Sequence, residues 1–112
     1  MKKNPKPYLR DILESIDKIN DYLGNVTKED FFDNTQLQDS VIRRFEIIGE
    51  AVKNIPEDFR EKHNEILWKK MTGMRDVLIH DYTGVDLKLV WNTFKNKLPV
   101  LRKQIKKLLD EE

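Results

Sequence analysis

The segment YLRDILESIDKINDYL, from Tyr8 to Leu23, has the clearest helical pattern in this chain. Its apolar residues recur three or four positions apart, the period that gathers side chains on one face of an α-helix. They are Leu9, Ile12, Leu13, Ile16, Ile19 and Leu23. We therefore predict an amphipathic helix over 8–23, with Gly24 as the residue just past its end. Pro5 and Pro7 are expected to keep residues 1–7 as an extended arm.

The same period continues beyond this helix. Thr27 is expected to cap a short turn that carries Phe31 and Phe32. Thr35 and Gln38 then form a capping-box pattern, which predicts the start of a second long helix. The apolar stripe of this helix consists of Val41, Ile42, Phe45, Ile48, Val52 and Ile55.

Pro56 is expected to end the second helix, because proline disfavours helical backbone at the residue before it. Residues 57–63 are interpreted as a loop or single turn with Phe59 packed inward. Asn64 is a plausible cap for a third long helix, whose apolar side is marked by Leu67, Met71, Met74 and Leu78.

The last part of the chain begins with a predicted turn over residues 82–85. Asp86 is expected to cap a final helix, which Pro99 should kink or split because proline lacks the N–H for one intrahelical hydrogen bond. Its apolar positions are Leu87, Val90, Phe94, Leu98, Leu101, Ile105 and Leu108. The prediction is an all-α, up-and-down bundle of four main helices plus short helical turns, forming one domain over residues 1–112.

Composition excludes several classes of function. The chain has 112 residues and 0 cysteines, so disulfides, thiolate zinc sites and cysteine nucleophiles are ruled out. The formal net charge is only +1, so contact with nucleic acid has to come from a local patch. No apolar run approaches the length of a membrane span. We expect a soluble cytoplasmic protein with no membrane contact, no metal and no cofactor.

Residues 74–82, MRDVLIHDY, concentrate the candidate chemistry. Arg75 is a permanent cation, His80 titrates near neutrality, and Tyr82 carries a phenol, which together suit a phosphodiester without metal. On a straight helix Arg75 and His80 lie about 140° apart, so spacing alone does not place them on one face. Asp76 is four residues before His80 and could orient its imidazole. The alternative is an ordinary helix end, with the basic side chains near its last carbonyls.

Metal-free RNA cleavage adds a constraint on assembly. The 2′-hydroxyl must lose a proton while the leaving 5′ oxygen gains one, so two acid–base groups are preferred. One protomer supplies a single His80. If the chain is a ribonuclease, we expect a two-fold homodimer in which both copies of this segment form one cleft.

The pattern Arg75-x4-His80-x-Tyr82 resembles the signature of HepT-like proteins in the HEPN superfamily. The surrounding segments agree across nearly the whole chain. They are Ile48-Gly49-Glu50-Ala51, Trp68-Lys69-Lys70-Met71, Gly84-Val85-Asp86, Val90-Trp91 and Leu98-Pro99. The resemblance rests on the whole set of segments in this order on a helical chain of this length.

The resemblance implies a HEPN-like helical domain and a ribonuclease toxin of a toxin–antitoxin pair. The implied partners are an RNA substrate, a second copy of the chain and a minimal nucleotidyltransferase (MNT) antitoxin. By motif position Arg75 and His80 are implied as catalytic, with Asp76 in support. Tyr82 matches the tyrosine that the antitoxin modifies with AMP in some members. HEPN relatives also include inactive proteins, so the alternative is a non-catalytic binding subunit or scaffold for the transferase.

Other polar residues carry weaker hypotheses. Glu46 and Glu50 share a helix face, and we interpret Glu46 as a surface partner of nearby basic residues. Glu50, beside Gly49, is kept as a possible supporting residue at the cleft. His63 is expected to be a solvated loop histidine. Trp68 and Trp91 are expected to anchor the core rather than to stack on bases, and Met71 and Met74 to lie in the core or on a dimer face. The basic residues near the C-terminus are expected to form a solvated face.

Overall fold

The structure, a computed structural model, describes residues 4–72 and 86–111. These two stretches fold into helices and contain no strand, which confirms the all-α prediction. The helices are α1 (Lys6–Leu23), α2 (Lys28–Asp33), α3 (Thr35–Asn54), α4 (Glu57–Lys62), α6 (Leu87–Asn96) and α7 (Leu98–Glu111). Residues 68–72 are also helical. None of the described helices is long and apolar enough to cross a lipid bilayer.

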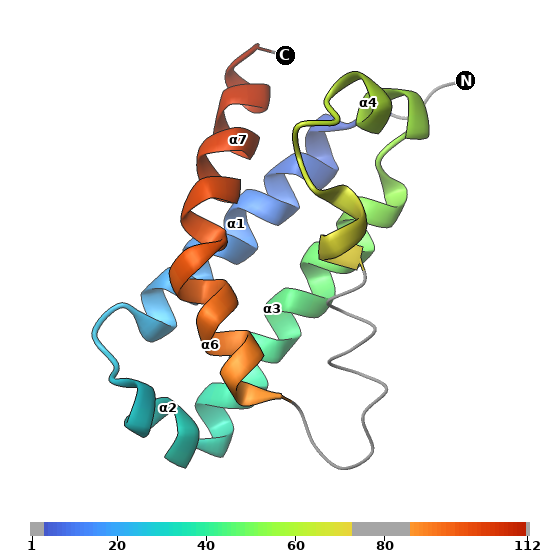
Figure 1. Ribbon diagram of the computed structural model, residues 1–112. Helices are drawn as coiled ribbons and strands as arrows, with labels where there is room; N and C mark the ends of the chain where they lie inside the picture. The colour runs from blue at the N-terminus through green and yellow to red at the C-terminus, as the bar shows by residue number, and fades with distance from the viewer. Residues whose placement is uncertain (1–3, 73–85, 112) are drawn as a thin grey trace.

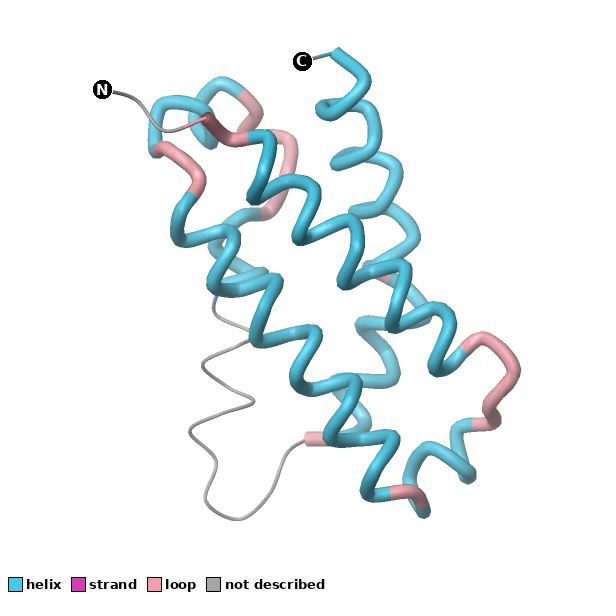
Figure 2. Tube along the Cα trace, turned by 180° about the vertical axis from the view of Figure 1, so that it is seen from behind, coloured by secondary structure: helices cyan, strands magenta, loops and turns pink. Residues whose placement is uncertain are grey.

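Helix α1 lies between α3 and α7. It packs against α3 on one side and against α7 on the other, and it runs antiparallel to both (Figure 1). Seen from behind, α1 and α3 lie side by side along their lengths (Figure 2). The stripe of α1 is buried as predicted, with Leu9, Ile12, Ile16 and Ile19 fully inaccessible to solvent. Each such side chain contributes about 1.5–3 kcal/mol by leaving water.

The start of α1 differs from the predicted extended arm. The helix already begins at Lys6, and Pro5 has the right-handed helical φ of −73°. The first helical N–H groups have no acceptor within the helix, so Pro7 costs nothing there. At the other end Gly24 is the C-cap with φ −57° and donates its N–H to the Asn20 carbonyl at 2.8 Å. The freedom of glycine to adopt positive φ is therefore not used.

Helix α3 is capped one residue earlier than predicted. Asn34, not Thr35, is the N-cap, and its Oδ1 accepts a hydrogen bond from the Leu37 N–H at 3.0 Å. Gln38 is not the second half of a capping box. Its Nε2 instead donates to the carbonyls of Phe31 and Phe32, both at 3.0 Å. The amide side chain thus joins the end of α2 to the first turn of α3.

Thr27 caps α2 as predicted, since its hydroxyl accepts from the Asp30 N–H at 3.1 Å. The segment 57–63, expected as a loop or single turn, contains the six-residue helix α4. Asn64 does not begin the next helix. Residues 63–66 form a turn, and the helical residues start at Trp68.

Asp86 caps α6 as predicted, with Oδ1 accepting from the Leu89 N–H at 3.0 Å. The expected break near Pro99 is also present, because α6 ends at Asn96 and α7 begins at Leu98. Lys97 lies between them, with a φ of −111°. Both halves contribute to the core through Val90, Trp91, Phe94, Leu98, Leu101, Ile105 and Leu108.

Candidate functional site

The central motif residues Arg75, Asp76, His80 and Tyr82 lie outside the described residues. The same holds for the predicted turn over 82–85. The described structure shows how the chain is held on each side of this segment. It also shows the surface that α3 presents.

On the N-terminal side the chain is anchored by Trp68. The Trp68 side chain lies in the core, and its Nε1 donates to the His63 carbonyl at 3.0 Å. Ile66 and Met71 are buried beside it, and the Thr72 hydroxyl bonds back to the Trp68 carbonyl at 3.3 Å. The core role predicted for Trp68 is confirmed, and Met71 takes the core position, one of the two expected for it. The position of residues 68–72 is therefore set by core packing.

On the C-terminal side the anchor is Trp91 in α6. Its ring lies 5.7 Å from the Phe31 ring and 5.4 Å from the Phe94 ring, measured between centroids. The Lys95 ammonium lies 5.5 Å from the Trp91 centroid, within cation–π range. The core role predicted for Trp91 is confirmed. Aromatic packing and the Asp86 cap together fix the position at which α6 begins.

Helix α3 contributes the Gly49–Glu50 segment. Gly49 is buried and Glu50 is exposed at the neighbouring position. Arg43 and Glu46 form the expected surface ion pair, with 3.4 Å between Nη1 and Oε2. Within residues 4–72 and 86–111 no three His, Asp or Glu side chains come together as a group that could hold a metal.

His63 differs from the prediction of a solvated loop histidine. Its side chain is only 15% exposed, and its ring packs at a tilt of 45° against the Phe59 ring with 4.6 Å between the centroids. Nδ1 lies 3.8 Å from the Glu65 carboxylate. Nε2 is buried without a hydrogen-bond partner among the described residues. The i, i+4 spacing of Phe59 and His63 was the sequence signal for this contact.

A second ion pair connects distant parts of the chain. Arg102 Nε in α7 donates to Asp17 Oδ1 in α1 at 2.7 Å. The hydrogen bond and the attraction of this carboxylate raise the pKa of Arg102. The pair is partly exposed, so it contributes little to stability, and it joins α1 and α7 at the surface.

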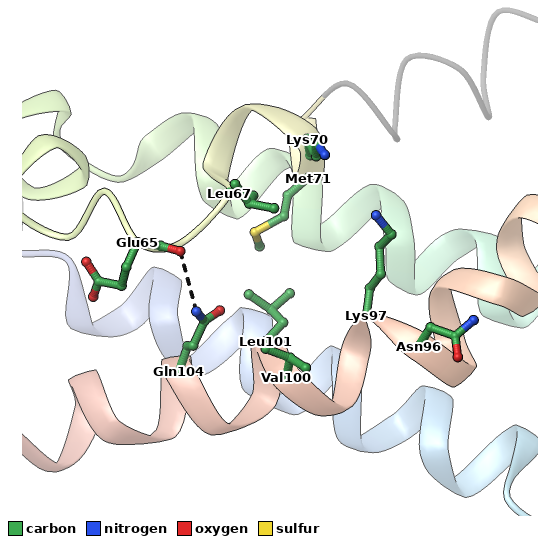
Figure 3. Close-up of a pocket in the computed structure, with 9 residues that line it drawn as sticks. All are labelled: Glu65, Leu67, Lys70, Met71, Asn96, Lys97, Val100, Leu101 and Gln104. Atoms are coloured by element: carbon green, nitrogen blue, oxygen red, sulfur yellow. Dashed lines mark hydrogen bonds between the residues drawn. The ribbon is translucent and has the colours of Figure 1, made fainter.

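A groove that the sequence did not predict lies between residues 65–71 and α7 (Figure 3). Its volume is about 380 Å³. We call it the Leu67–Val100 groove and define it by Leu67, Lys70, Met71, Lys97, Val100 and Leu101. The sequence signal for the groove was Val100, an apolar residue that does not lie on the buried face of α7. That face consists of Leu98, Leu101, Ile105 and Leu108.

Residues 12–108 match the family model described as "Ribonuclease HepT-like". The chain belongs to the HepT-like family. The match covers most of the HepT-like chain and includes both anchors and the segment between them. The family resemblance inferred from the motif is thereby confirmed.

Similar proteins carry related names. A "Gamma-glutamylcyclotransferase and putative RNase" of Methanocaldococcus jannaschii is 52% identical over 111 residues, which cover 99% of this HepT-like chain and 50% of that protein. The chain thus spans half the length of that relative. A "Probable ribonuclease HepT" of Thermococcus cleftensis is 47% identical over 108 residues, covering 96% of this chain and 98% of that one.

The fold is shared with a solved structure. The tri-AMPylated Shewanella oneidensis HEPN toxin in complex with MNT antitoxin superposes with a TM-score of 0.73, and the match covers 100% of both chains. The sequences are 23% identical, so the likeness establishes the HEPN fold for this HepT-like chain.

Proposed function

We propose that this HepT-like chain is a metal-independent endoribonuclease toxin of a toxin–antitoxin pair, acting on RNA in the cytoplasm. The observation that carries the proposal is the family match over residues 12–108, because this stretch contains Arg75-x4-His80-x-Tyr82. The relative named as a ribonuclease supports RNA as the substrate. The toxin of shared fold, which is in complex with an MNT antitoxin, supports a nucleotidyltransferase partner.

The chemistry follows from the residue types. The 2′-oxygen of one nucleotide attacks the adjacent phosphorus, and the bond from phosphorus to the 5′ oxygen breaks. One His80 takes the proton of the 2′-hydroxyl, and a second, protonated His80 gives a proton to the leaving 5′ oxygen. The products are a 2′,3′-cyclic phosphate and a free 5′-hydroxyl. Arg75 stabilises the negative charge that grows on the phosphoryl oxygens.

A homodimer completes this site. One chain carries one His80 and one Arg75, so two chains related by a two-fold axis supply both the base and the acid in a composite cleft. Asp76 supports the catalytic pair by orienting the His80 imidazole and favouring its protonated form. Glu50, exposed next to the buried Gly49, is a candidate supporting residue on α3.

Neutralisation acts on Tyr82 at the mouth of the cleft. The phenol oxygen attacks the α-phosphorus of ATP bound by the transferase, pyrophosphate leaves, and the phenolic proton passes to solvent. The attached AMP places bulk and negative charge where a phosphate of RNA has to bind. Steric exclusion and like-charge repulsion then both oppose substrate binding.

The test is cleavage of RNA by the purified chain in excess chelator. Wild type is expected to cleave, and Arg75→Ala and His80→Ala are each expected to lose activity. Arg43→Ala on the outer surface of α3 and His63→Ala are the matched controls, because they remove the same side-chain types elsewhere. Circular dichroism verifies that each variant is folded.

Two results would contradict the proposal. Activity that disappears with chelator would show that a metal is required. Absence of activity in every folded sample, with binding to the transferase intact, would favour the non-catalytic scaffold instead.

A further inference from the structure

The Leu67–Val100 groove has an aliphatic floor on the outside of the bundle. Leu67 is 57% exposed and Val100 is 56% exposed, and these are the exposed large apolar side chains of the described residues. They line the same groove, together with the more deeply placed Met71 and Leu101 (Figure 3). Exposed apolar residues scattered singly need no explanation, but two that meet in one hollow mark an interaction site.

The packing of neighbouring residues keeps these two side chains exposed. Leu67 lies between Ile66 and Trp68, both of which are buried, so its own side chain is directed away from the core. Val100 lies in α7 just before the buried Leu101. Moving either side chain inward would require the adjacent core residue to leave its place. The apolar floor is therefore a fixed property of the fold.

Positive charge borders one end of the floor. Lys70 and Lys97 line the groove there, and neither forms an ion pair within the described stretches. Residues 86–111 as a whole carry seven basic side chains against three acidic ones. The other end is different, since the Glu65 carboxylate is exposed there and the Glu65 carbonyl accepts from Gln104 Nε2 at 3.5 Å.

The aliphatic floor and the lysines at one end favour one kind of binding partner for the groove over others. Single-stranded RNA needs aromatic or guanidinium planes on which bases stack, and the groove offers aliphatic side chains instead. A second copy seated on the same face would bring four lysines and two glutamates together, with an excess of like charge. An amphipathic helix with aliphatic residues on one face and carboxylates at one end fits both the floor and the lysines.

We propose that the Leu67–Val100 groove is a docking site for an acidic amphipathic helix of a partner protein. The aliphatic residues of that helix pack on Leu67, Met71 and Val100. Its carboxylates lie at the end of the groove that holds Lys70 and Lys97. This assignment is separate from the ribonuclease proposal, since it uses none of Arg75, His80 and Tyr82.

The probe is a synthetic, fluorescein-labelled helical peptide with leucines at i, i+4 and i+7 and glutamates beyond the last leucine. Binding to the full chain is measured by fluorescence polarisation. Wild type is expected to bind, and more weakly as salt rises. The double variant Lys70→Glu/Lys97→Glu is expected to weaken binding about tenfold or more, and so is Leu67→Ser/Val100→Ser. Lys53→Glu on α3 is the control for a charge reversal elsewhere.

A second peptide, in which lysines replace the glutamates, tests the charge pairing. It is expected to bind the variant Lys70→Glu/Lys97→Glu and not to bind wild type. Equal binding of the acidic peptide to wild type and to the groove variants overturns the proposal. So does a single-stranded oligonucleotide that binds wild type and is lost in the same variants, which would assign the groove to RNA. A wild-type dimer in sedimentation equilibrium that Leu67→Ser/Val100→Ser dissociates would assign it to a second copy.

Discussion

The indole Nε1 of Trp68 donates a hydrogen bond to the backbone carbonyl of His63 over 3.0 Å. This bond closes the turn between α4 and the helical residues 68–72. The Trp68 ring is buried, so the turn and the core are held by the same side chain. The position of residues 68–72, the last described before residue 73, thus depends on this tryptophan.

Replacing Trp68 with Phe is expected to lower the free energy of unfolding by about 1–2 kcal/mol. The smaller ring packs less surface, and the hydrogen bond to His63 is lost. Urea unfolding followed by circular dichroism measures the change. Trp91→Phe is the matched control, because it removes the same ring area from the core without a bond of this kind. Equal losses in the two variants would show that the Trp68 bond contributes nothing.

The N-cap of α3 can be assigned by two neighbouring substitutions. Asn34→Ala is expected to cost about 1 kcal/mol of stability, because the Leu37 N–H loses its acceptor. Thr35→Ala should change stability little, since Thr35 is the first helical residue and not the cap. Thermal unfolding of the two variants side by side tests this. A larger loss from Thr35→Ala would support the capping box that the sequence indicates.

Ser15 is a candidate site for stabilisation. Its side chain is fully buried in α1, and Oγ has no hydrogen-bond partner among the described residues. Ser15→Ala removes the unpaired hydroxyl and improves helix propensity, so we expect a gain of about 1 kcal/mol. Ser40→Ala is the control, because the Ser40 hydroxyl donates to the Gln36 carbonyl at 3.0 Å. A loss of stability in Ser15→Ala would mean that its hydroxyl is bonded in solution.

Tyr82→Phe separates toxicity from neutralisation. The variant is expected to keep ribonuclease activity, since the phenol oxygen takes no part in the proposed cleavage. It should escape inhibition by the transferase with ATP, because the acceptor oxygen is gone. Residual RNA cleavage after incubation with transferase and ATP is the measurement. Full inhibition of Tyr82→Phe would show that neutralisation acts through another residue or through binding alone.

The helical periodicity predicted most of the fold because burial follows it directly. The stripe of α1, the Asp86 cap and the break before Pro99 are all present where the pattern indicated them. Local chemistry was harder to assign. Asn34 and Thr35 are both good capping residues, and only the pairing of Gln38 with the carbonyls of α2 decides between them.

The groove escaped prediction because it depends on contacts between distant segments. Leu67 has the spacing of a core residue in the predicted third helix, yet that helix starts later and leaves Leu67 outside. The chemistry of the motif was inferred from its residue types and from the family pattern. Arg75 and His80 lie within 73–85, outside the described residues, so their catalytic roles are predictions that the experiments above test.

The first turn of α1 and the last turn of α7 lie at the same end of the bundle, while α2 and the start of α6 lie at the opposite end (Figures 1 and 2). The Arg102–Asp17 pair holds these two helices together along their shared side. A purification tag or reporter fused beyond either helix is therefore kept remote from the start of α6. When the chain is immobilised on a sensor through such a fusion, the end of the bundle at the start of α6 stays accessible to binding partners in solution.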